Sequence, residues 1–165
     1  MRIQEIVLKE NISSRVIDNV NGLGQVPKNQ DVDYFGLRVS MRPSIFLKLS
    51  AELARPQAEN IEYMEDHLSD GGKIGAPFLS LEVPSSWREG DISGRVRVSD
   101  HEGRHRMIAF MNVFGDELIE VHLFPLQMRS RHITTEMVQQ MQHGMESQDG
   151  NLVKHYPLFF TEGQI

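Results

Sequence analysis

The stretch Val96-Arg-Val-Ser-Asp-His-Glu-Gly-Arg-His-Arg-Met-Ile-Ala-Phe110 predicts a strand, a polar turn and a helix in succession. Valines alternate with polar residues, which indicates a half-buried strand over residues 95–99. Asp100 is a candidate helix cap, and Gly103 permits a tight turn or a close backbone approach. Apolar residues then recur at helical spacing, so we predict a helix over residues 104–114.

The unusual feature of this stretch is the position of its positive charge. Arg104, His105 and Arg106 fall in the first turn of the predicted helix, where the free amide N–H groups are already positive. An exposed cation there costs about 0.3–1 kcal/mol, and a bound anion reverses the sign. We therefore predict an oxyanion site, most simply for phosphate, at Gly103, Arg104, His105 and Arg106. The alternative is that both arginines are solvated, with nearby acidic residues as counterions.

Length and composition limit the class of protein. The 165 residues suit one domain, and the net charge of −6 provides no general basic field that would attract nucleic acid. Any phosphate contact must therefore come from a local cluster. The absence of cysteine excludes disulfides and thiolate chemistry and is typical of the reducing cytosol, so we expect a cytoplasmic protein. No apolar run approaches the 18 residues of a membrane span, and the charged N-terminus does not resemble a signal peptide.

The predicted elements alternate between strands and helices. Before the central stretch we expect strands over 3–8, 34–39 and 78–83, a helix opened by Pro43 and stopped by Pro56, and a helix over 58–69. After it we expect a strand over 118–124, with Ile119, Val121 and Leu123 buried, and a last helix that begins at Thr134 or Thr135 and carries Met137, Met141 and Met145. This order favours an α+β (mixed α/β) fold with a small mixed sheet flanked by helices.

Three segments divide the chain. Residues 1–33 are expected to form an N-terminal strand and a long polar loop or arm, residues 34–146 the main domain, and residues 147–165 a C-terminal docking tail with an apolar patch. The 11–33 loop and the tail would suit contacts with a second copy of the chain or with other protein subunits.

The segment His101-Glu-Gly-Arg-His105 matches the H-E-x-x-H signature of zinc peptidases, in which both histidines lie on one helical face. Gly103 between the two histidines and the charged flanking residues argue against it, and only Glu117 or Glu120 could supply a third ligand. If the helix begins near Gly103, His101 is not on it. We therefore assign no metal ligands, and zinc remains the weakest interpretation.

At this point the chain resembles the ParB/sulfiredoxin-like superfamily. In that superfamily a strand leads into a box of the form D-G-x-H-R or G-x-R-R at a helix N-terminus. The counterpart here is Asp100-His-Glu-Gly-Arg-His-Arg106, followed by an apolar helix and the strand around Ile119-Glu-Val-His-Leu123. The likeness spans roughly residues 34–126 and includes Gly71-Gly-Lys-Ile-Gly-Ala-Pro77 before the 78–83 strand. It is most similar to versions found in phage proteins.

The resemblance implies a phosphate-handling site at this box. Members bind CTP or ATP phosphates there, and some transfer phosphoryl groups or are classed as nucleases. By position, Gly103 to Arg106 would cradle the phosphate and Asp100 would shape the turn. The box cysteine of sulfiredoxin is absent, so its chemistry is not implied. A second recognition helix after residue 134 is not evident, so partition-type DNA clamping is not expected.

Three classes of function remain open. The first is an enzyme that acts on a nucleotide or on nucleic-acid phosphate, with Glu102 and Asp100 as catalytic carboxylates and Mg²⁺ as the cofactor. The second is a non-catalytic phage virion or accessory protein that kept the fold, located in the host cytoplasm or the virion. The third is the zinc peptidase. Further basic residues that could extend a phosphate site are Arg42, Lys73, Arg129, Arg131 and His132.

Overall fold

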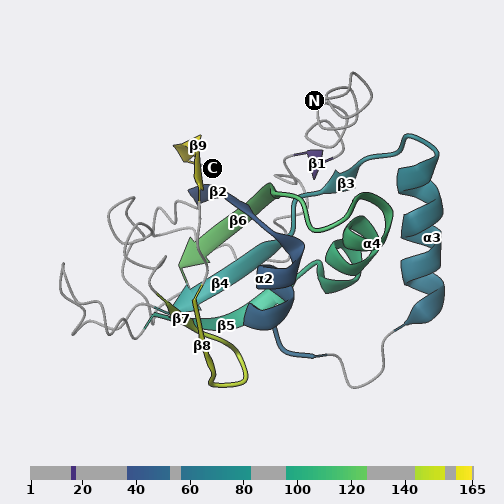
Figure 1. Cartoon of the computed structure of the whole chain (residues 1–165). Coiled ribbons are helices and arrows are strands. Elements are labelled where there is room, and N and C mark those ends of the chain that lie inside the picture. Colours follow the sequence, from purple (N-terminus) through teal and green to yellow (C-terminus); the bar gives the residue numbers. More distant parts are fainter. Residues whose placement is uncertain are drawn as a thin grey trace, which may run out of the picture.

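The computed structural model describes residues 16–17, 37–52, 57–82, 96–125, 144–154 and 159–164, which form a mixed α/β architecture (Figure 1). This confirms the predicted mixed α/β class of fold. The larger sheet in this part of the chain has seven strands in the order β8-β7-β5-β4-β6-β2-β9. Its strands are β2 (Leu37–Met41), β4 (Phe78–Glu82), β5 (Arg97–Glu102), β6 (Ile119–Pro125), β7 (Met145–Glu146), β8 (Leu152–Val153) and β9 (Phe159–Gln164). A separate parallel pair joins β1 (Val16–Ile17) to β3 (Ile74–Gly75).

The larger sheet is mixed because its centre combines both strand directions. β4 pairs antiparallel with β5 on one side and parallel with β6 on the other. β2 and β9 extend the sheet beyond β6 through antiparallel pairs, and β7 runs parallel to β5 at the other end. The segment 147–165, which we expected to dock as a tail, thus contributes a strand at each edge of this sheet.

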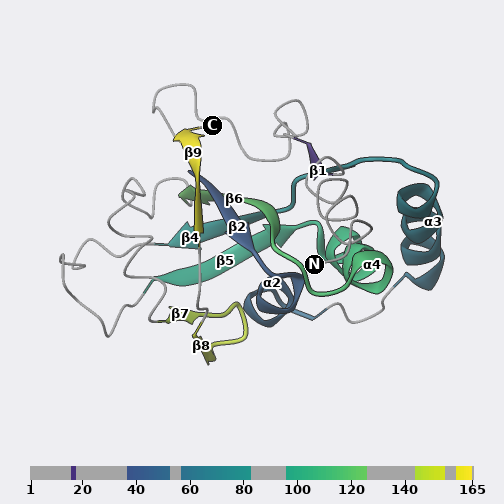
Figure 2. The same ribbon diagram turned by 45° about the horizontal axis from the view of Figure 1, so that its top comes forward.

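The described helices are α2 (Pro43–Leu49), α3 (Ala58–Ser69) and α4 (Arg104–Phe114). They gather on one side of the molecule, with α4 between α2 and α3 (Figures 1 and 2). Pro43 occupies the first turn of α2, as predicted, since its fixed φ suits a helix start. The chain leaves α3 through Gly71, whose φ of 95° is left-handed. Both α3 and α4 have the predicted bounds.

The core lies between these helices and the sheet. Phe46 and Leu49 of α2 and Phe110 of α4 are fully buried. The predicted buried face of β6 is confirmed, because Ile119, Val121 and Leu123 are buried, but the strand does not alternate, since His122 and Phe124 on its other face are buried as well. In the part of the chain described, no helix is long and apolar enough to cross a bilayer.

Two predictions about element ends were wrong. The helix opened by Pro43 ends at Leu49 rather than near Pro56, because Ser50 turns to extended backbone with ψ of 150°. There both its N–H and its hydroxyl donate to the carbonyl of Phe46. The prediction that the last helix extends to Met145 is also wrong, since Met145 lies in β7 and pairs with Val153.

Other predicted features lie outside the described residues. These are the 3–8 strand, most of the 11–33 loop, the start of the last helix after residue 134, and the basic residues Arg129, Arg131 and His132.

Candidate functional site

The junction between β5 and α4 is built around Gly103. This residue has φ of 107°, a left-handed conformation that other residues rarely adopt. A Cβ at this position would lie 2.6 Å from Pro77 Cβ, so the packing also requires glycine. The predicted tight turn is confirmed. α4 starts at Arg104 with no acidic residue in its first turn and no side-chain cap, so the predicted placement of three basic residues there is also confirmed.

Asp100 does not cap this helix, which corrects our prediction. β5 continues to Glu102 because it pairs with β4 as far as Phe78, and Gly103 is the N-cap residue. The Asp100 carboxylate instead accepts a hydrogen bond from the N–H of His101 at 2.8 Å.

A β-bulge in β5 decides which way its polar side chains face. Val98 pairs with Leu81, but Asp100 pairs with Ser80, so Ser99 is an extra residue in the ladder. Such an insertion reverses the alternation of faces beyond it. His101 therefore shares the helix-covered face with Val98, and its ring lies edge-on to Phe46 at 6.5 Å.

The two candidate catalytic carboxylates lie on the other face of β5, and both residues are exposed. Glu102 Oε1 lies 3.8 Å from Arg106 Nη2, so Glu102 acts as a counterion of the first-turn arginine. The structure does not bring Glu102 or Asp100 to Arg104. Neither of them lines the cleft described below.

Arg106 is largely enclosed. Its side chain is 14% exposed, and Nη1 donates to the carbonyl of Gly75 at 2.8 Å. Burial lowers the pKa of Arg106 from its ordinary value, and the negative charge of Glu102 partly opposes this change. Arg106 therefore ties the start of α4 to β3.

Arg104 is directed to the C-terminus of α2. Its Nη1 donates to the carbonyl of Leu47 at 2.8 Å, to the hydroxyl of Ser50 at 2.7 Å and to the carbonyl of Ser50 at 3.3 Å. A cation is favourable at a helix C-terminus, where carbonyl groups lack helical partners. The charge that is unfavourable at the start of α4 is thus stabilised by the end of a neighbouring helix.

The other end of α2 is held by a residue that follows α4. Asp116 accepts hydrogen bonds from the backbone N–H of Ser44 at 2.9 Å and from its hydroxyl at 2.6 Å. The side chain of Arg42 donates to the carbonyl of Asp116 as well, so it lies at the far end of α4 from Gly103. Asp116, just after α4, therefore supplies an acidic group to the start of α2, and Arg104, the first residue of α4, supplies a basic group to its end.

The two histidines of the H-E-x-x-H match are not on one helical face. α4 begins after His101, which lies in β5, whereas His105 is in the first helical turn. His105 Nε2 accepts a hydrogen bond from the N–H of Gln57 at 3.3 Å, next to the start of α3. Within the described ranges, no group of three or more His, Cys, Asp or Glu side chains could hold a metal ion.

A cleft of about 450 Å³ lies between the end of α2 and the β7–β8 hairpin, and Arg104 contributes to its wall. Lys48, Glu52 and Asp149 also line it, and none of the three forms an ion pair with any residue that the structure describes. The full lining is Leu47, Lys48, Ser50, Glu52, Arg104, Asp149, Asn151 and Val153. Of the four predicted phosphate ligands, only Arg104 reaches this cleft.

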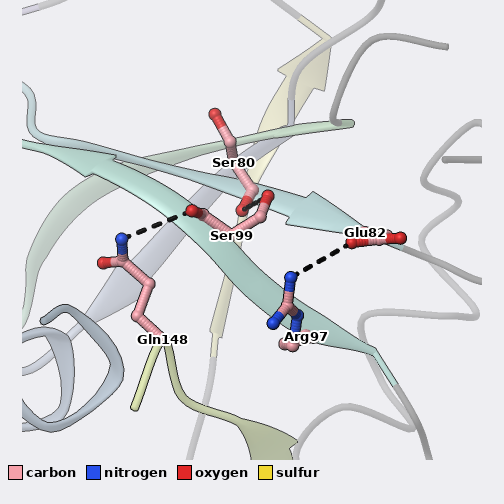
Figure 3. Close-up of polar contacts among 5 residues, drawn as sticks. All are labelled: Ser80, Glu82, Arg97, Ser99 and Gln148. Carbon is pink, nitrogen blue, oxygen red and sulfur yellow. Dashed lines mark hydrogen bonds and ion pairs between the residues drawn. The ribbon is translucent and has the colours of Figure 1, made fainter. Parts of the chain in front are cut away.

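Gln148 is a site residue that the sequence analysis missed. Its side-chain nitrogen donates to the carbonyl of Ser99 at 3.3 Å, which links the turn of the hairpin to β5 (Figure 3). Its Oε1 accepts from the N–H of Ala51 at 2.8 Å and lies 2.6 Å from His101 Nδ1. The available signal was the turn-forming Asp149-Gly150 pair that follows it, which predicts a hairpin in place of a tail.

Comparison with known proteins gives no relative from which a function could be transferred: no protein-family model matches the chain, and no curated protein or solved structure matches it significantly.

Proposed function

We propose that this chain is a ParB/sulfiredoxin-like domain that binds a nucleotide or a nucleic-acid phosphate in the cleft beside Arg104. The proposal rests on which nitrogen atoms of the Arg104 guanidinium already have a hydrogen-bond partner. Nη1 is fixed by the end of α2, while Nε and Nη2 have no hydrogen-bond acceptor among the described residues. A guanidinium held on one side presents its remaining N–H groups in a fixed orientation, which suits phosphate oxygens.

The composition of the cleft supports this class of ligand. Lys48 adds a second cation, and a volume of about 450 Å³ is that of a site for a small organic ligand. Glu52, Asp149 and Asn151 offer oxygen atoms that can accept hydrogen bonds from sugar hydroxyl groups. A nucleotide usually binds as its Mg²⁺ complex, and carboxylates are suitable ligands for this ion. The proposal is for binding and includes no turnover, because Glu102 and Asp100 lie on the other face of β5.

A purely structural role is the second candidate, and one specific observation favours it. Each basic residue of the first turn of α4 has a partner within the chain: Arg104 binds α2, His105 binds the N–H of Gln57, and Arg106 binds Gly75. A non-catalytic phage virion or accessory protein that kept the fold would need only these contacts within the chain and no bound ligand.

Calorimetric titration separates the two candidates. The ligands to be titrated are CTP, ATP and ADP with Mg²⁺, inorganic phosphate and short DNA. Lys48→Gln should weaken the binding of any phosphate ligand about three- to tenfold, since it removes one exposed cation from the cleft. Lys73→Gln is the matched control, because Lys73 is exposed and does not line the cleft. If none of these ligands binds at millimolar concentration, the phosphate proposal fails and the structural role is favoured.

A further inference from the structure

The β7–β8 hairpin forms one wall of the cleft. Two residues of its turn, Asp149 and Asn151, and Val153 of β8 line the cleft opposite the end of α2. The turn over residues 147–151 is held together internally. The N–H of Ser147 donates to the carbonyl of Asn151 at 2.7 Å, and the N–H of Asn151 donates to the Ser147 hydroxyl at 3.0 Å. Ser147 itself is fully buried, so the part of the turn that is free to move is its exposed tip over residues 149–151.

The turn is attached to the rest of the described structure through Gln148. Its backbone N–H donates to the carbonyl of Leu49 at 3.0 Å, and its side chain contacts Ala51, His101 and Ser99. Every hydrogen bond found between residues 147–151 and described residues outside the hairpin involves Gln148. One residue thus joins the turn to both the end of α2 and β5, through its backbone N–H and its side chain.

The base of the hairpin is attached differently from its turn. Met145 is fully buried and Val153 is 9% exposed, and β7 pairs with β5 at the residue pair Arg97 and Glu146. At the tip, in contrast, Asp149, Gly150 and Asn151 are exposed. A buried base and an exposed tip allow the tip to swing without unfolding the core.

We propose that the β7–β8 hairpin is a hinged strap over the cleft and that Gln148 is the latch that holds it shut. With the latch closed, Asp149 and Asn151 face the cleft contents. With the latch open, the cleft loses one wall and a ligand can enter or leave. The control of ligand exchange rests on the proposed function, whereas the latch itself does not. Gln148 is a positioning residue in this proposal.

Hydrogen exchange of the ligand-free full chain, measured by mass spectrometry, tests the latch. Gln148→Met keeps the side-chain length and the backbone bond to Leu49 but removes the three side-chain hydrogen bonds, so amides over 146–153 should exchange about tenfold faster. Gln148→Glu keeps the acceptor for Ala51 and His101 and should restore slow exchange to within about threefold of the unmodified chain. Amides of α4 and β6 should stay unchanged in both variants. Unchanged exchange over 146–153 in Gln148→Met would overturn the latch, as would equal acceleration in α4 and β6.

A second measurement concerns the ligand and uses pyrophosphate as the probe. In the unmodified chain, saturating pyrophosphate should slow exchange over residues 146–153, and Gln148→Met should raise the dissociation rate of pyrophosphate about tenfold. Binding without any change in exchange over these residues would overturn the strap as a gate. An absence of pyrophosphate binding would count against the proposed function, while the exchange of the ligand-free variants would still decide the latch.

Discussion

Arg104 and Ser50 are joined by two hydrogen bonds from a single guanidinium nitrogen, to the hydroxyl at 2.7 Å and to the carbonyl at 3.3 Å. This contact places a positive charge at the C-terminus of α2, although Arg104 itself stands at the N-terminus of α4. It explains how the first turn of α4 tolerates a cation that its own N–H groups disfavour. It also holds in place the guanidinium that forms part of the wall of the cleft.

Replacing Arg104 should therefore destabilise the fold. Arg104→Met keeps the aliphatic stem but removes the bonds to Leu47 and Ser50, and we expect a loss of about 1–3 kcal/mol in the free energy of unfolding. Urea denaturation measures this loss. Arg97→Met is the control, since Arg97 lies exposed on β5 beside Glu82 and should change stability by less than about 1 kcal/mol. Equal losses in the two variants would contradict the role of Arg104.

Asp116 should support the other end of α2 in the same way. Asp116→Ala removes the acceptor of the Ser44 N–H and hydroxyl, which should cost about 0.5–2 kcal/mol. Combined with Arg104→Met, the loss should be smaller than the sum of the single losses, because α2 has 7 residues and is released by either change. A double-mutant cycle from denaturation curves measures this coupling. Strict additivity would show that the two ends of α2 are held independently.

Gly103 should tolerate no side chain. Gly103→Ala would place a Cβ 2.6 Å from Pro77 Cβ and force alanine into a conformation with φ of 107°. The conformational penalty alone is about 1–2 kcal/mol, and the overlap adds to it. Gly115→Ala is a useful control, because Gly115 also has a positive φ, of 87°, but its Cβ would meet nothing within 4 Å. If thermal unfolding shows the two variants equally stable, the packing of Pro77 on Gly103 is unimportant.

Much of this architecture follows from local sequence patterns. The bounds of α3 and α4, the left-handed glycine before α4 and the buried side of β6 all depend on periodicity or turn chemistry within a few residues. These are the features that the sequence predicted correctly.

The errors arise where distant residues decide the structure. The bulge at Ser99 depends on pairing with β4, so the facing of Asp100 and Glu102 could not be obtained from β5 alone. The latch at Gln148 depends on Ala51, which is 97 residues away in the sequence. The grouping of Arg104, His105 and Arg106 into one site assumed that all three side chains point the same way, whereas each contacts a different element.

Glu102 should act on stability through Arg106. Glu102→Gln removes the charge that partly opposes the lowered pKa of Arg106, so the buried guanidinium loses its counterion. Because Glu102 is 47% exposed, we expect a small loss of about 0.3–1 kcal/mol at low salt that disappears at high salt. Asp100→Asn on the same face is the control. A loss that is unaffected by salt would indicate a packing effect instead of an ion pair.

The most direct test of the central claim observes Arg104 without mutating it. In ¹⁵N–¹H NMR spectra, titration with a nucleoside triphosphate and Mg²⁺ should shift the Arg104 Nε–Hε signal in a saturable way, with the same dissociation constant as calorimetry. The side-chain signal of Arg97, which does not line the cleft, should not move. Binding that leaves the Arg104 side-chain signal unchanged, or the absence of any nucleotide-dependent shift, would contradict a phosphate site at this arginine.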